Sequence, residues 1–434
     1  MAVLLSPRSA EVAAARRAGA RAVVVAPGPS VPSDREGAER RVRTDWRDHR
    51  RLIGAVGRLA AVRHGRACVF GFGPAAALAA ARANEALGLP GTPAAAITAL
   101  MDKAALRARS NTLHATRPVS FARCGRAGLI PFLTALIGYP CVIKPRAGTD
   151  GEGVRLVRDP AEAEAAALDY PEVTDLLVEE FLEGPELTVA TLSHQGRHRT
   201  LGWTRRLPTP ALAPAPASGP RHPGRPQHLA ALGYDVPVVL DAGTAEAVRA
   251  LVRGVLDLAG HHDGPSHVEV VLTPYGPRLV EAHARPGAEE FTELLRLAHG
   301  TDVLGLTFAA ALGLPAPVRK PPVTAHAGLR YVDFPPGCRL DGLAVALAAA
   351  RALPGVARVQ LEVPPDATVR HAPTGALHHA YVLATGPTRH ALARSLDRAT
   401  ALLRAPAPPA PEEPHTPNPR GIHIPRPRSG HGDD

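Results

Sequence analysis

The sequence predicts a multidomain protein of mixed α/β and α+β class. The chain has 434 residues, which is too long for one ordinary core and suggests two to four domains. Residues 1–98 alternate short apolar β runs with Ala/Arg-rich helical stretches, as small parallel α/β units do. Residues 141–157, CVIKPRAGTDGEGVRLV, are typical of a strand, a glycine-rich loop and a second strand.

The composition is that of a globular protein, with 45% apolar and 21% charged residues. No apolar run reaches the roughly 18 residues that a membrane span needs, so we expect no membrane association. The N-terminus, MAVLLSPRSA, has too short an apolar run and no preceding basic region for a secretory signal, which favours a cytoplasmic protein. The four cysteines show no CxxC spacing, so we expect buried, reduced thiols.

The charge pattern argues against a nucleic-acid partner. The net charge is +10, but the arginines are scattered and form no basic run. Lysine occurs only at Lys103, Lys144 and Lys320, so arginine has displaced it nearly everywhere. A compact ammonium suits a phosphate oxygen at some sites better than a planar guanidinium does. Two of the three, Lys103 and Lys144, are therefore candidate phosphate ligands.

The first segment, residues 1–98, contains predicted strands at Val3–Leu5, Ala22–Ala26 and Cys68–Phe72. GFGPAA (71–76) imitates a dinucleotide fingerprint, but no acidic residue follows at the end of a second strand about 20 residues later. A tight strand-to-helix turn is the favoured interpretation of this stretch.

The later segments follow in order. The proline density of 207–227 predicts a loop or lid, and the apolar stripe in 245–259 predicts a helix packed on a core. A further α/β segment spans 320–404 and ends in the helix RHALARSLDRATALLR. The Pro/Arg/His-rich tail, 405–434, has the composition of a disordered segment.

The glycine-rich loop after Lys144 points to phosphate binding. No stretch of the chain matches the P-loop, in which the lysine follows the glycines. Here Lys144 ends a strand, and Gly148, Gly151 and Gly153 permit a tight turn whose amides approach phosphate oxygens. The stretch predicts a β-hairpin flap over a nucleotide, with a hairpin that binds no ligand as the alternative.

A predicted strand over 176–192 carries carboxylates among Leu, Val and Phe: Glu179, Glu180, Glu183 and Glu186. Buried carboxylates need donors, and a nucleoside supplies them through its amine and its ribose hydroxyls. A solvated face remains the alternative for Glu180 and Glu183.

Residues 267–287 predict a second hairpin. If it is symmetric about Tyr275, Glu269 lies opposite Glu281 and His267 lies opposite His283. The other face then carries the apolar residues Val268, Val270, Leu272, Val280 and Ala282. Opposed like charges destabilise a sheet, and Mg²⁺ between the glutamates would remove the repulsion. Two surface glutamates on a solvated sheet face are the alternative.

Together these stretches resemble the ATP-grasp ligases. The resemblance rests on MDKAALR (101–107), PCVIKP with TDGEGV (140–154), VEEFLEGPELTV (178–189) and HVEVVL with RLVEAHARPG (267–287). It covers about 100–315. Two later stretches, LRYVDFPPG (329–337) and ALPGVARVQLEVPPDATV (352–369), are similar to the C-terminal domain of the amino-acid ligase branch.

The resemblance implies an ATP-grasp fold in several parts. Its expected divisions are an N-terminal Rossmann-like pre-ATP-grasp domain (1–98), an ATP-grasp core (99–318), a C-terminal α/β ligase domain (319–404) and the tail (405–434). Within the core, the nucleotide flap is expected over 115–183 and the metal-binding catalytic subdomain over 184–318.

The resemblance also implies roles for single residues. The ATP phosphates would be bound by Lys103, Lys144 and the 148–153 loop. Glu179 would accept a hydrogen bond from the adenine amine, and the backbones of Glu180 and Leu182 would complete the adenine contact. Glu186 would bind the ribose. Glu269 and Glu281 would bind magnesium, and Arg285 would steady the transferring phosphoryl group. His283 stands where the family commonly has Asn, and an imidazole is a softer metal ligand than an amide oxygen.

The implied reaction joins a carboxylate to an amine through an acyl phosphate, with ATP and Mg²⁺ (or Mn²⁺) and release of ADP and phosphate. Amino acids are the expected substrates, and a homodimer is compatible with the sequence. The alternatives are another ATP-grasp ligase or carboxylase, or a nucleotide-binding protein without turnover. Trp203, Arg205 and Arg206 are the candidate substrate contacts, with ordinary exposed residues as the alternative.

Overall fold

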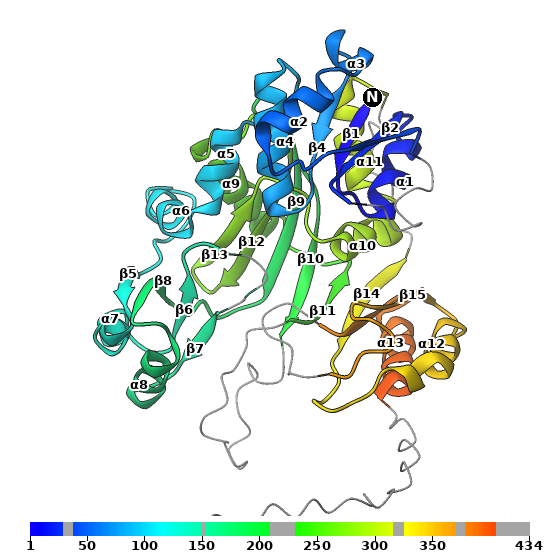
Figure 1. Cartoon of the computed structure of the whole chain (residues 1–434). Coiled ribbons are helices and arrows are strands. Elements are labelled where there is room, and N and C mark those ends of the chain that lie inside the picture. Colours follow the sequence, from blue (N-terminus) through cyan, green and yellow to red (C-terminus); the bar gives the residue numbers. More distant parts are fainter. Residues whose placement is uncertain are drawn as a thin grey trace, which may run out of the picture.

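The computed structural model describes residues 1–28, 38–148, 151, 153–208, 231–315, 325–369 and 378–404. Most of the predicted lid (207–227) and the whole predicted tail (405–434) lie outside these residues, and so does Lys320. The described residues form three sheets with helices packed on them (Figure 1). Among them, no helix is long and apolar enough to cross a membrane.

The N-terminal unit is a parallel α/β layer, as the sequence predicts. Its sheet has the order β3-β2-β1-β4. The elements are β1 (Ala2–Leu5), α1 (Ser9–Arg17), β2 (Ala22–Ala26), β3 (Arg40–Arg43), α2 (His49–Val56), α3 (Ala60–Arg63), β4 (Cys68–Phe70) and α4 (Pro74–Ala86). A Cβ on Gly71 would lie 2.2 Å from the Ala76 backbone, so GFGPAA is the tight strand-to-helix turn.

A second, antiparallel sheet forms the flap, with the order β5-β8-β6-β7. It contains β5 (Phe121–Arg126), α7 (Ile130–Ile137), β6 (Cys141–Pro145), β7 (Arg155–Val157), α8 (Pro160–Asp169) and β8 (Val173–Glu180). Two helices, α5 (Ala94–Met101) and α6 (Lys103–Ser110), precede it in the chain. In Figure 1 this sheet stands apart from the larger sheet, with α7 and α8 on its outer side.

The third sheet has eight strands in the order β13-β12-β9-β10-β11-β14-β16-β15. Its first part contains β9 (Glu186–His194), β10 (Arg197–Pro208), β11 (Ala231–Val236), α9 (Ala242–Leu258), β12 (Gly264–Thr273), β13 (Gly276–His283), α10 (Glu289–His299) and α11 (Val303–Leu312). Its C-terminal part contains β14 (His326–Val332), α12 (Ala344–Arg351), β15 (Val356–Leu361), β16 (Ala380–Gly386) and α13 (Arg389–Arg404). The sheet runs unbroken past the predicted boundary at 318/319, so the domain divisions stay predictions.

The predicted strand over 176–192 is wrong as a single element. It is two strands in different sheets, β8 in the flap and β9 in the large sheet. The break lies between them at Phe181–Pro185, where Gly184 has φ +146° and a Cβ would lie 2.1 Å from the Leu272 carbonyl oxygen. Both strands contain enough apolar residues to be buried, so their composition does not reveal that they belong to different sheets.

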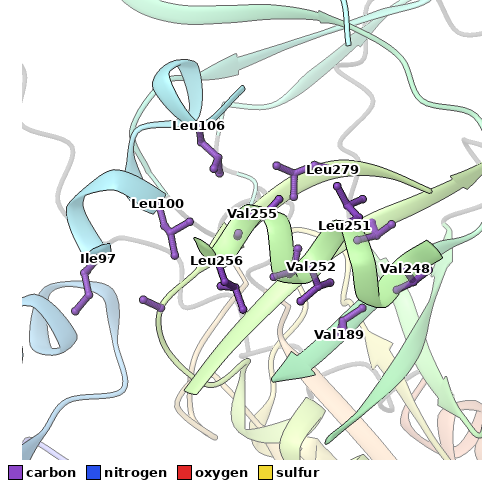
Figure 2. Close-up of a cluster of buried hydrophobic side chains, with 14 of the residues drawn as sticks. Ile97, Leu100, Leu106, Val189, Val248, Leu251, Val252, Val255, Leu256 and Leu279 are labelled. Atoms are coloured by element: carbon purple, nitrogen blue, oxygen red, sulfur yellow. The ribbon is translucent and has the colours of Figure 1, made fainter. Parts of the chain in front are cut away.

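The helical stripe predicted in 245–259 is confirmed. Figure 2 shows Val248, Leu251, Val252, Val255 and Leu256 of α9 packed with Leu279 of β13 and Val189 of β9. These side chains are fully or almost fully buried. All four cysteines are free, and the prediction of buried thiols is confirmed for Cys68, Cys124 and Cys141 but wrong for Cys338, which is only partly buried.

This packing predicts a large cost for a cavity in the α9 stripe. Leu251→Ala should lower the free energy of unfolding by about 2–5 kcal/mol, because Leu251 is fully buried. Urea denaturation followed by circular dichroism measures the change. Leu168→Ala on α8, where the side chain is 88% exposed, is the matched control and should be nearly silent. Equal losses in the two variants would contradict the assignment of this core.

Candidate active site

A cavity of about 820 Å³ opens between the flap sheet and the large sheet. Its walls contain nearly all of the residues predicted from the sequence: Lys103, Lys144, Gly148, Gly151, Glu179, Glu180, Leu182, Glu186, Glu269, Glu281, His283 and Arg285. Gly153 does not line it; a Cβ there would lie 2.9 Å from the Pro145 ring. Residues separated by up to 182 positions in the chain therefore meet in one cavity.

The flap end of the cavity has the predicted hairpin. β6 pairs antiparallel with β7, and Lys144 lies near the end of β6. Gly148, Gly151 and Gly153 all have positive φ, between 68° and 127°, which favours glycine at each turn position. Phe181, Leu182 and Val142 add apolar side chains to the same end of the cavity, as a nucleobase would need.

A buried ion cluster lies behind this end. The Glu179 carboxylate accepts from Arg107 Nε at 2.8 Å and lies 2.6 Å from Lys144 Nζ. All three side chains are less than 10% exposed. Burial opposes ionisation of Glu179, but Lys144 and Arg107 outweigh it and lower its pKa to about 2. The structure therefore makes Glu179 the counter-ion of two cations, and its contact with an adenine amine stays a prediction.

Arg107 is the functional residue that sequence reasoning missed. Besides Glu179, it donates to the backbone carbonyls of Leu279 at 2.6 Å and Val280 at 3.1 Å. It therefore ties α6 and the flap strand β8 to the hairpin strand β13. Its signal was present in MDKAALR (101–107), where an arginine follows the lysine on one helix, but a single helical arginine usually has only a solvated role.

The hairpin formed by β12 and β13 has the predicted pairing. His267 lies opposite His283 and Glu269 lies opposite Glu281. The turn itself is centred between Pro274 and Tyr275, since Thr273 pairs with Gly276. From this turn alone, Glu269 would pair with Val280. A β-bulge between the turn and the glutamates adds one residue to β13, so Glu269 pairs with Glu281 instead.

This bulge corrects one detail of the prediction. Val270 pairs with Leu279 rather than with Val280, so Val280 is the extra residue. Leu279 therefore takes the core position on the apolar face, and Val280 lines the cavity beside the glutamates.

The two glutamates have opposite electrostatic surroundings. Burial, with the charges of Glu281 and Glu186, raises the pKa of Glu269 well above its ordinary value. Burial also opposes ionisation of Glu281, but the hydrogen bond and charge of His283, with the charge of Lys103, lower its pKa. The His283 ring lies with Nε2 3.1 Å from Glu281 and stacks on His267 at 4.7 Å.

Lys103 connects the two ends of the cavity. Its Nζ donates to the Gly148 carbonyl at 2.6 Å and lies 3.6 Å from the Glu281 carboxylate. Because Lys103 begins α6, its ammonium stands between the glycine loop and the acidic hairpin. An anion bound between these two elements would meet Lys103 and Lys144 together.

The donor set fits a small hard cation. Carboxylate oxygens on facing strands are ligands that Mg²⁺ prefers. Within the described ranges, no group of three or more His, Cys, Asp or Glu side chains is arranged to hold a metal ion. Glu269 and Glu281 would therefore share a cation with oxygen atoms of a bound molecule, as they would with phosphates.

Two other carboxylates of the predicted nucleotide strand have partners. The Glu180 carboxylate accepts from Arg278 and from the Ser120 backbone N–H. Its own N–H donates to the Ser120 carbonyl at 3.0 Å, so the predicted adenine contact would fall to its backbone carbonyl. Glu186 accepts from Arg206 at 3.0 Å, within the cavity wall.

The predicted substrate contacts divide into two groups. Arg205 and Arg206 line the cavity, where they pair with Asp235 and Glu186. Trp203 does not line it, so the expectation that it contacts substrate is wrong. Its indole packs against the core cluster of α9, and its N–H donates to the Val238 carbonyl at 3.0 Å.

Family models match two parts of the chain. An ATP-grasp domain matches residues 130–289, and the L-amino acid ligase C-terminal domain 2 matches residues 344–405. Among solved structures, an L-amino acid ligase from Bacillus licheniformis has the same fold, with a TM-score of 0.71 at 21% identity over 92% of this chain and 96% of that one.

Two sequence relatives are longer than the segment that they share with this chain. The chain is 26% identical over 324 residues to the uncharacterized protein y4rH of Sinorhizobium fredii, covering 72% of this chain and 62% of that protein. It is 27% identical over 290 residues to carnosine synthase 1 of Gallus gallus, covering 59% of this chain and 29% of that protein. The chain thus spans less than two thirds of the length of either relative.

The part of the chain that forms most of the two-sheet cavity is therefore an ATP-grasp domain. Its C-terminal segment matches the model of the L-amino acid ligase C-terminal domain 2, and the fold of the chain is similar to that of an L-amino acid ligase.

The ion cluster predicts a pH-dependent contribution to stability. A depressed carboxyl pKa stabilises the fold above the unfolded value of about 4.3, and this stability is lost as the pH falls toward the folded value of about 2. Glu179→Gln should therefore lower the free energy of unfolding by about 3 kcal/mol at pH 7, and the difference from wild type should shrink between pH 4.5 and pH 2. Urea titrations across this range measure it.

Glu183→Gln is the matched control, because Glu183 is exposed four residues further along the same segment. Its effect should be small at every pH. A Glu179→Gln deficit that stays constant down to pH 2 would show that the charge of Glu179 does not support the fold.

Proposed function

We propose that this protein is an ATP-dependent ligase that joins the carboxylate of one amino acid to the amine of another. The observation that best supports this proposal is the pair of opposed glutamates, Glu269 and Glu281, in one cavity with Lys103 and Lys144. Phosphoryl transfer depends mostly on positioning and on neutralising charge, and this cavity contains both the anionic hairpin for a cation and the cations for an anion.

The nucleotide would lie at the flap end. The backbones of Glu180 and Leu182 would contact the adenine among Phe181 and Val142, with Glu179 close behind them. Glu186 would bind the ribose. The glycine loop, Lys103 and Lys144 would bind the phosphates, so that the γ-phosphate points toward the acidic hairpin.

Glu269 and Glu281 would hold Mg²⁺, with His283 beside them, and the bound ion would neutralise phosphate charge. The residues of this chain would do the rest. Lys144 would balance the charge of the transferring group, and Arg285, which lines the cavity next to the hairpin, would steady the phosphoryl group and then the acyl phosphate.

The proposed reaction has two steps. A carboxylate oxygen of the first substrate attacks the γ-phosphorus, and the bond to the ADP oxygen breaks, giving an acyl phosphate. The amine of the second substrate then attacks the acyl carbon, and the C–O bond to phosphate breaks. The products are the amide, ADP and phosphate.

A screen of amino-acid pairs tests this function. Each pair is incubated with ATP and Mg²⁺, ADP release is followed, and the condensed product is sought by mass spectrometry. Pair-dependent ADP release with a product that is one water lighter than the two substrates supports the ligase. ATP binding without turnover in every mixture would favour the nucleotide-binding alternative, and turnover with other carboxylates would favour a different ATP-grasp ligase.

The glutamate pair predicts that fold and activity respond in opposite ways to one substitution. Glu269→Gln removes a carboxyl group whose ionisation is opposed by burial and by Glu281. The metal-free protein should be as stable as wild type or more stable by roughly 0.2–1 kcal/mol, as for other like-charge cross-strand pairs. ADP release with Mg²⁺ should fall by at least about 100-fold, because one ligand for the cation is lost.

Thermal melts in a chelator and ADP-release assays measure the two effects. Glu246→Gln, on the exposed face of α9, is the matched control and should leave activity unchanged. A Glu269→Gln variant that melts earlier and still turns over ATP at the wild-type rate would show that Glu269 is structural.

A further inference from the structure

An Asp–His pair lies at the end of the cavity formed by the C-terminal strands. Asp333 follows β14 directly, and His378 lies two residues before β16. Because Val332 pairs with Ala380, the two strands bring these residues to the same end of the sheet. His378 Nδ1 lies 3.0 and 3.1 Å from the two Asp333 carboxylate oxygens.

The His378 ring is held on two sides. Its face stacks on Tyr331 at 3.8 Å with an interplanar angle of 10°, and its side chain is only 4% exposed. With Nδ1–H donated to Asp333, the neutral ring has its lone pair on Nε2. That atom is buried, and no residue in the described part of the chain donates to it or accepts from it. His378 and Tyr331 both line the cavity.

We propose that His378 is the general base for the amine substrate, an inference that rests on the proposed ligase function. The amine of a free amino acid is almost fully protonated at neutral pH, since its pKa lies well above 7, and an ammonium has no lone pair for attack. His378 Nε2 takes one proton from it, and the freed lone pair attacks the acyl carbon. The C–O bond to phosphate breaks, one N–H proton leaves with the phosphate, and the amide keeps the third.

The surroundings give the amine a defined place. Glu290 on α10 lines the same cavity, and its charge acts on Tyr331, as does that of Arg206 on β10. An ammonium between Glu290 and His378 would face an anion and a proton acceptor. Tyr234 and Tyr381 also act on Tyr331, and the charges of Asp333 and His378 act on His379. The Nδ1 atom of His379 already accepts a hydrogen bond from the Phe334 backbone N–H at 3.0 Å.

Two half-reactions separate this role from the rest of the catalysis. Hydroxylamine is largely neutral at pH 7.5 and traps an acyl phosphate as a hydroxamate without needing a base. The probes are ATP, Mg²⁺ and a mixture of the twenty standard amino acids, with or without hydroxylamine. His378→Gln should form hydroxamate within about threefold of wild type, while peptide formation falls by about 10²- to 10⁴-fold, the usual contribution of a general base. The deficit should shrink as the pH rises above the pKa of the amine.

Asp333→Asn is the second variant. It keeps the size of the side chain but presents an amide N–H to Nδ1, which moves the ring proton to Nε2 and removes the acceptor. It should show the same selective loss, with melting temperature and circular dichroism confirming the fold. His326→Gln, at the start of β14, is the matched control and should leave both half-reactions unchanged.

Equal losses in both half-reactions, or an unchanged peptide rate in His378→Gln, would overturn the inference and leave the ligase intact. A wild-type protein that forms neither ADP nor hydroxamate in any mixture would instead overturn the proposed function, and with it the need for a base.

Discussion

The buried pair of Arg107 and Glu179 is the interaction on which the rest of the cavity depends. Glu179 belongs to the flap sheet, and Arg107 reaches from α6 to it and to the carbonyls of Leu279 and Val280 on the large sheet. The loss of one partner of a buried pair leaves an uncompensated charge and usually costs about 3–5 kcal/mol. One guanidinium therefore holds a flap strand, a helix and the bulged strand in a single arrangement.

The bulge and the acidic pair follow from this contact. Val280 is the extra residue of the bulge, and its carbonyl is one of those that Arg107 binds. A bulge interrupts the ladder and leaves backbone groups in need of partners. Arg107 supplies a donor at that point, and Glu281 comes directly after it. The same side chain thus neutralises Glu179 beside Lys144 and stabilises the backbone that positions the glutamates.

The sequence was most informative where the determinants are local. The pairing of Glu269 with Glu281 held because the bulge offset the misplaced turn centre. The hairpin itself was predicted from the turn residues between its two strands, because these residues are close together in the chain. The flap hairpin was predicted from its glycines, and the α9 core from its spacing, for the same reason. The bulge was missed because the choice between Leu279 and Val280 as the core residue depends on Arg107, 172 residues away.

Other features depend on long-range contacts that no local pattern records. The strand β3, RRVR, has almost no apolar residues and forms only because β2 offers it a parallel edge. The break between β8 and β9 lies inside one apolar stretch, so periodicity continues across two different sheets. Trp203 looked like an exposed aromatic but packs on α9, and His378 acquires its partner Asp333 through the pairing of β14 with β16. Only the folded chain brings these residues together.

The continuity of the eight-stranded sheet has a mechanical consequence. The acidic hairpin is one end of this sheet, and the strands that carry Asp333 and His378 belong to the other half, so backbone hydrogen bonds run from one to the other without interruption. The flap sheet joins this frame through Phe181–Pro185 and through side-chain contacts such as that of Arg107. The distance between Glu281 and His378 is therefore set by one continuous sheet, whereas the position of the flap depends on the contacts of Arg107.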